Sequence, residues 1–130
     1  MKKIVCLAII ACFLVGCGCS YYIEGRVETL NVTGLMAQSA GLNGRVELNT
    51  EGSRANPTVT ERGFVLRREG MASRRISAGG REFGNFIATA INLLPNTTYS
   101  VQAFATIRYR DNYGTITTTF YGNIIEFTTR

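Results

Sequence analysis

Few residues in this sequence could carry out acid–base or metal chemistry. It contains no histidine, and its nine carboxylates are scattered along the chain without a spacing that would pair any two of them. General acid–base catalysis most often depends on histidine, and a zinc site needs several histidine or cysteine ligands. We therefore expect no enzymatic activity, no bound metal and no cofactor.

The cysteines are the remaining reactive side chains, and their positions follow a secretory pattern. Two lysines at positions 2 and 3 precede an apolar run from Ile4 to Val15, which ends in small residues. This is the layout of a secretory signal. Twelve apolar residues are too few to cross the roughly 30 Å hydrocarbon core as a helix.

The end of the apolar run, Leu14-Val15-Gly16-Cys17, resembles the lipobox of bacterial lipoproteins. The resemblance implies cleavage before Cys17 and a diacylglyceryl group on its thiol. Two or more acyl chains hold a protein stably on a membrane. We therefore expect a signal peptide over residues 1–16, a lipidated anchor and tether over 17–26, and a domain over 27–130.

Removal of the signal would leave a mildly basic chain. It would keep Cys17 and Cys19 of the four cysteines, so with Cys17 lipidated no internal disulfide could form. Its twelve arginines and nine acids give a net charge near +3, which is no indication of nucleic-acid binding. We expect the lipid anchor to place it in the bacterial cell envelope, in the outer membrane. Residues 18–23 carry no acidic cluster, which favours the periplasmic leaflet but leaves the leaflet open.

From Val27 onward the pattern predicts strand after strand. Between Leu42 and Asn49, apolar residues and glycine alternate with polar ones, as a sheet with one buried face requires. Short strands with turn signals about ten residues apart are typical of a sandwich. The expected strands span residues 27–36, 42–49, 60–68, 74–77, 86–93, 99–109 and 115–129, with Asp111 to Gly114 closing the last hairpin.

One run, Leu94-Pro95-Asn96-Thr97-Thr98-Tyr99, resembles the tyrosine corner of fibronectin type III domains. In that corner the tyrosine hydroxyl bonds back to the backbone. The runs at 42–46, 61–65, 86–89, 101–106, 121–123 and 127–129 also resemble strands of the fibronectin type III-like modules of bacterial envelope lipoproteins. The resemblance implies a seven-stranded, all-β, immunoglobulin-like sandwich. The sequence departs from it by having no tryptophan and by a longer arm from Ile107 to Phe120.

Two sets of residues are candidates for binding. The hairpin arm carries Tyr and Arg side chains that are common in protein-recognition surfaces: Arg108, Tyr109, Arg110, Asp111 and Tyr113. A second set crowds the middle of the chain, where Arg could bind carboxylate or phosphate: Arg67, Arg68, Arg74 and Arg75. The same arginines could instead protect an edge strand from aggregation by charge.

We place recognition on the hairpin arm. The function expected from these residues is a membrane-anchored, non-catalytic binding module for a protein or glycan partner. The alternative is a structural spacer or accessory subunit of a larger envelope assembly.

Overall fold

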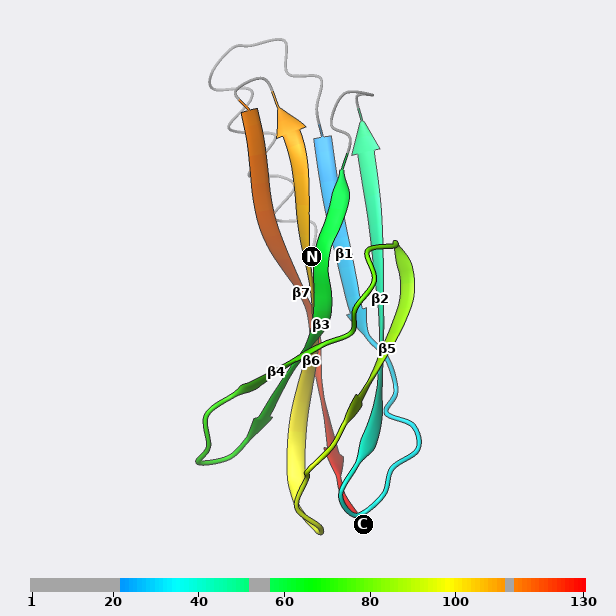
Figure 1. Ribbon diagram of the computed structural model, residues 1–130, viewed down its shortest axis with the longest axis vertical. Coiled ribbons are helices and arrows are strands. Elements are labelled where there is room, and N and C mark those ends of the chain that lie inside the picture. The colour runs from blue at the N-terminus through cyan, green and yellow to red at the C-terminus, as the bar shows by residue number, and fades with distance from the viewer. Residues whose placement is uncertain (1–21, 52–56, 112–113) are drawn as a thin grey trace.

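The computed structural model describes residues 22–51, 57–111 and 114–130, which form a two-layered β structure (Figure 1). Most of its strands run along the long axis of the molecule. They are β1 (Tyr22–Thr29), β2 (Ala40–Glu51), β3 (Thr58–Arg68), β4 (Arg74–Ser77), β5 (Gly84–Ala90), β6 (Thr98–Asp111) and β7 (Gly114–Thr128). Among the described residues, no helix is long and apolar enough to cross a membrane.

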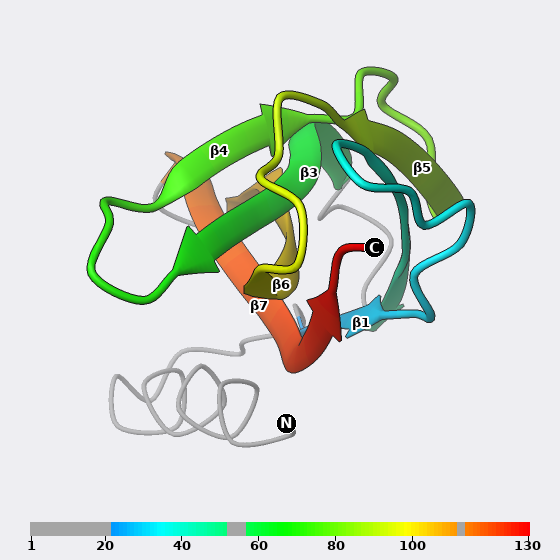
Figure 2. The ribbon, with the colours of Figure 1, turned by 90° about the horizontal axis from the view of Figure 1, so that it is seen from below.

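The strands form two antiparallel sheets that pack face to face. One sheet has the order β1-β2-β5 and the other β4-β3-β6-β7. Figure 2 shows β4, β3, β6 and β7 on one side of the molecule and β1 and β5 on the other. This strand order is the arrangement of a fibronectin type III-like sandwich, which confirms the fold class expected from the sequence.

The core lies between the two sheets and is built by the alternation that the sequence predicts. Leu42, Gly44 and Val46 point inward from β2, and Val101, Ala103 and Ala105 point inward from β6. Phe64 and Phe86 meet in the centre of the core with ring centroids 5.2 Å apart. Burial of these side chains supplies the main stabilising free energy of the sandwich.

The expected position of the first strand was wrong. We expected a tether up to Arg26 and a strand over residues 27–36, but β1 begins at Tyr22 and ends at Thr29. The physical reason is the length of β2, whose far end pairs Glu51 with Tyr22. After Thr29 the regular ladder ends: Leu30 and Thr33 still bond to β2, and Gly34 then adopts a φ of 57°. Residues 22–26 therefore belong to the sandwich.

The fifth strand is also displaced from its expected range of 86–93. It begins at Gly84 and ends at Ala90, because Asn92 takes a φ of 61° and turns the chain away from the sheet. The other five strands lie within two residues of their expected bounds at each end. Asp111 pairs with Gly114, so the expected hairpin between β6 and β7 is also confirmed.

The tyrosine corner predicted from the sequence is present between β5 and β6. The Leu94 amide donates a hydrogen bond to the Tyr99 hydroxyl at 2.9 Å. The Tyr99 ring is buried and stacks on Phe127 with centroids 5.7 Å apart. Leu94 itself is exposed, and Pro95 is exposed beside it. The hydroxyl therefore satisfies a backbone donor in the connection that leads into β6.

A bulge in β7 joins the two sheets along one side of the sandwich. Pairing with β6 shifts between Gln102 and Phe104, and the extra residue lies in the Gly122–Asn123 segment of β7. The Asn123 side chain accepts from the Thr29 amide at 2.9 Å and donates to the Thr29 carbonyl at 3.3 Å. The Thr29 hydroxyl in turn accepts from the Ala103 amide at 2.8 Å. The end of β1 is thus fixed to the opposite sheet by hydrogen bonds.

Candidate recognition face

The outer face of the four-stranded sheet carries four of the nine candidate binding residues: Arg67, Arg75, Arg108 and Arg110. On β6, Gln102, Phe104, Thr106 and Arg108 alternate with inward residues and so share this face. Pairing places side chains of β3 and β7 beside them, and Arg75 of β4 lies next to Val65. We call this surface the outer face.

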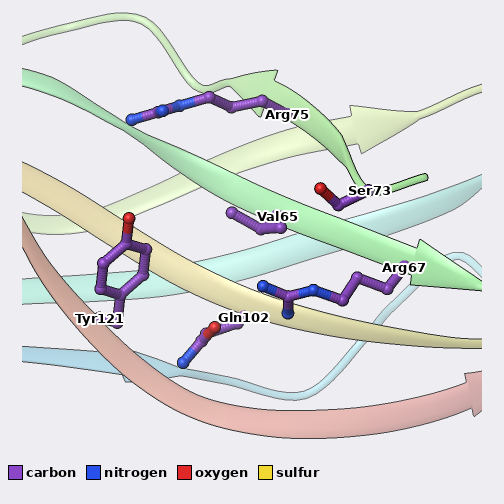
Figure 3. Close-up of a pocket in the computed structure, with 6 residues that line it drawn as sticks. All are labelled: Val65, Arg67, Ser73, Arg75, Gln102 and Tyr121. Carbon is purple, nitrogen blue, oxygen red and sulfur yellow. The ribbon is translucent and has the colours of Figure 1, made fainter.

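A shallow hollow of about 430 Å³ lies in the middle of the outer face (Figure 3). Figure 3 shows its lining residues coming from the four strands of the sheet and from the loop before β4. They are Val65, Arg67, Ser73, Arg75, Gln102 and Tyr121. The hollow therefore combines two guanidinium groups, an amide, a hydroxyl and an aromatic ring around an apolar floor.

The Arg75 side of the hollow is held in place by an aromatic pair. Phe104 points to the outer face but is fully buried, because Arg75 lies over its ring at 4.1 Å from the centroid. Tyr121 covers it from β7, with ring centroids 6.4 Å apart. Such a contact between a guanidinium and an aromatic face stabilises the position of the cation. Arg75 also lies 3.5 Å from a carboxylate oxygen of Glu61.

Tyr121 and Gln102 form the β6–β7 side of the hollow. Tyr121 is 54% exposed, so much of its ring is available to a ligand. Gln102 donates its Nε2 to the Gly122 carbonyl at 2.8 Å, which orients the amide. Its Oε1 remains able to accept a hydrogen bond from a ligand.

Arg67 differs from Arg75 in its electrostatic environment. Within the described part of the chain, no carboxylate lies within salt-bridge distance of Arg67. It projects from β3 into the hollow and is exposed. Arginine presents five donors in a planar fork that matches a carboxylate or phosphate. Arg67 is therefore the cation in the hollow best placed to bind an anion.

The outer face of the opposite sheet has a different charge balance. There Arg45 of β2 pairs with Glu28 of β1 and lies 3.6 Å from Glu47. The hydrogen bond from Arg45 to Glu28, the charge of Glu28 and then that of Glu47 raise the pKa of Arg45 above its ordinary value. This arginine is neutralised by its neighbours, in contrast to Arg67.

The four arginines expected to form one basic patch are only partly separated by the strand alternation. Arg67 and Arg75 lie on the outer face at the hollow. Arg68 and Arg74 line a second hollow of about 280 Å³ beside the tyrosine corner, where Arg74 donates to the Ile91 carbonyl at 2.8 Å. Adjacent residues on a strand point to opposite faces, but Arg67, at the end of β3 beside Arg68, also lines this second hollow.

Two of the five candidate residues of the hairpin arm contribute to the outer face. Arg108 and Arg110 are exposed on that face, opposite Thr117 and Thr115. Tyr109 points the other way and packs, half-buried, against the core. Asp111 closes the ladder with Gly114, while Tyr113 lies outside the described residues. That the hairpin arm carries recognition stays a prediction.

Arg62, on β3 ahead of Arg67 and Arg68, is an internal structural residue. Its Nε donates to the Gly79 carbonyl at 2.8 Å and its Nη1 to the Glu82 carbonyl at 2.6 Å. It also lies over the Phe86 ring at 5.3 Å from the centroid. Arg62 thus fixes the connection between β4 and β5.

Several residues of the hollow were not among the candidates from sequence: Val65, Ser73, Gln102 and Tyr121. Tyr121 and Gln102 were recognised only as strand residues. The alternation in β6 already places Gln102 on the outer face with Phe104. Their juxtaposition with Arg67 depends on the pairing register and on the bulge in β7, which no local pattern specifies. Cys17 and Cys19 lie outside the described residues.

No protein-family model matches this sequence, and no curated protein matches it. Solved structures do resemble its fold. The solution structure of the sensor domain of the anti-sigma factor RsgI4 in Pseudobacteroides cellulosolvens matches with a TM-score of 0.54 and 17% identity, over 82% of this chain and 75% of that chain. A second structure of that sensor domain matches with a TM-score of 0.51 and 18% identity, over 82% of this chain and 89% of that chain.

At these identities the similarity establishes the fold alone. Together with the strand order and the tyrosine corner, it defines the described residues as a fibronectin type III-like β-sandwich. The function of such a fold depends on the particular surface that the chain presents.

Proposed function

We propose that this protein is a lipid-anchored, non-catalytic binding module of the bacterial envelope, and that the outer face is its recognition surface. The observation that carries the proposal is the hollow that is lined by Arg67, Arg75, Gln102 and an exposed Tyr121. Arginine and tyrosine are enriched where proteins recognise partners, because they combine rigid contact area with directed hydrogen bonds. On the opposite face, by contrast, Arg45 is paired with Glu28.

The architecture is compatible with an anchor at the N-terminal side. The first described residue of β1 is Tyr22, five residues after Cys17. Five extended residues reach at most about 18 Å. Figure 1 places the start of β1 at the same end of the sandwich as the tip of the β6–β7 hairpin. A lipid on Cys17 would therefore hold this end close to the membrane and leave the outer face accessible from the side.

Lipidation is tested by metabolic labelling of cells that express the full chain. We expect a fatty-acid analogue to label the wild type and not Cys17→Ser, and the wild type to fractionate with the outer membrane. Equal labelling of both proteins, or of neither, would refute the anchor.

Recognition by the outer face is tested with the full chain, purified in mild detergent and immobilised for capture from envelope extract. We expect a double variant, Arg67→Gln with Tyr121→Ser, to lose the captured component. Arg26→Gln is the matched control, since Arg26 is exposed on β1 in the opposite sheet. The accessory-subunit alternative gives a different result: a component at fixed stoichiometry that the double variant retains. A variant of Arg108 and Arg110 to Gln tests the hairpin arm in parallel.

A further inference from the structure

The outer face carries an excess of positive charge along its length. Its exposed arginines are Arg67, Arg75, Arg108 and Arg110, whereas Glu61 and Glu126 are its described acidic residues. Glu61 lies near Arg75, which leaves Arg67 and the two hairpin arginines without a described carboxylate within salt-bridge distance. The face is therefore complementary to an anion with more than one charge.

The spacing of these charges favours a polymer over a small anion. Arg67 pairs with Ser100 of β6, and Arg110 lies ten residues further along that strand. At about 3.3 Å per residue, the two cations are roughly 30 Å apart along the sheet. A single phosphate or sugar acid would occupy only the hollow, whereas an extended chain with repeated negative charges could contact both ends.

The uncharged groups on the outer face match the remaining chemistry of a sugar. Tyr121 and the apolar floor at Val65 offer a surface for the C–H groups of a pyranose ring. Hydroxyl and amide groups of Ser73, Gln102 and Thr117 provide donors and acceptors for sugar hydroxyls.

An acidic peptide is a poorer match to the same surface. One common way for an extended peptide to bind is to add its backbone to the edge of a sheet. The backbone groups of the central strands β3 and β6 are used in the ladders with their neighbours. The outer face therefore presents side chains to a ligand rather than backbone partners.

We infer that the ligand of the outer face is an acidic polysaccharide that carries carboxylate groups on its sugars. This inference rests on the proposed function and names the substrate class of the same surface. The carboxylates bind Arg67 in the hollow and Arg108 and Arg110 further along, while a sugar ring packs on Tyr121.

The test measures binding of the full chain in detergent to three soluble polymers of similar length, by isothermal titration at physiological salt. Polygalacturonate is the carboxylated glycan, galactan is its neutral counterpart, and poly-glutamate is the acidic peptide. We expect polygalacturonate to bind at least tenfold more tightly than the other two. Arg67→Gln should weaken it about tenfold, because hydrogen bonds to charged groups contribute strongly. Tyr121→Ser should weaken it several-fold, and Arg26→Gln should leave it unchanged.

The possible failures separate the ligand class from the site. In one outcome galactan binds as tightly as polygalacturonate, or poly-glutamate binds more tightly, and that binding is lost in Arg67→Gln. This result would overturn the acidic polysaccharide as the ligand class and leave the proposed recognition face standing. Failure of all three polymers to bind would overturn the ligand class. Capture from envelope extract tests separately whether the outer face is a recognition surface. Polygalacturonate binding that Arg26→Gln weakens as much as Arg67→Gln would show general charge attraction and overturn both the ligand site and the role of the hollow.

Discussion

Replacing Arg62 by methionine tests whether the interior arginine stabilises the sandwich. The side chain is only 10% exposed and donates to the carbonyls of Gly79 and Glu82, in the connection between β4 and β5. Methionine keeps the apolar length of the side chain and removes the donors. We expect the free energy of unfolding to fall as these two hydrogen bonds are lost.

The size of the loss follows from the groups left behind. A hydrogen bond from a charged donor contributes about 1.5–3 kcal/mol. Gly79 and Glu82 are exposed, so water can solvate their carbonyls after the change, and the low end of that range applies to each. The two bonds together give a loss of about 3 kcal/mol. With a urea dependence of about 1–3 kcal/mol per M, the midpoint should fall by 1 M or more.

The assay is urea denaturation followed by far-ultraviolet circular dichroism, with Arg67→Met as the matched control on the same strand. Arg67 faces outward and pairs with no described carboxylate, so its replacement should change the free energy of unfolding by less than about 0.5 kcal/mol. Arg62→Lys should lie between the two, because lysine keeps the charge but cannot reach both carbonyls with a planar fork. Equal midpoints for Arg62→Met and Arg67→Met would refute the inward position of Arg62 and the register of β3.

Two further predictions concern stability. Tyr99→Phe should keep the stacking on Phe127 and leave the Leu94 amide without its acceptor, at a cost of about 1–3 kcal/mol in urea denaturation; an unchanged midpoint would mean that water replaces the hydroxyl. Asn123→Ala should remove both side-chain bonds to Thr29 and cost about 1–3 kcal/mol, with faster hydrogen exchange of the Thr29 amide as the specific readout. Protection of the Thr29 amide at the wild-type level would contradict the hydrogen bonds from Asn123 to Thr29 that connect the two sheets.

The sequence was sufficient to predict most of the sandwich, because its determinants are local. Alternation along residues 42–49 defines a strand with one buried face, and the run from Leu94 to Tyr99 specifies the corner. The start of β1 was missed because its partner is the far end of β2, and such pairing depends on a distant segment.

Only part of the candidate site, Arg67 and Arg75, was predicted from the sequence, for a related reason. The alternation that places Phe64 and Leu66 in the core also places Arg62 inside and Arg67 outside, and this signal was present in the sequence. The four arginines expected as one patch do not all share a face for this reason. The contribution of Tyr121 could not be predicted from its local sequence, because the β7 bulge and the register with β6 bring its ring over Phe104.

The hydrogen bonds between Asn123 and Thr29 have a consequence for contacts between copies of the protein. An edge strand exposes backbone donors and acceptors that can template pairing with another chain. Here β1 and β7 are edges of different sheets, and the Asn123 amide occupies the donor and the acceptor of Thr29 where the two meet. On the other side the edge strand β4 has only four residues, and Arg62 holds the chain that follows it. Copies crowded side by side would therefore find neither the backbone of Thr29 nor a long β4 with which to fuse their sheets, so pairing between copies would have to use β5 or the rest of β1 or β7.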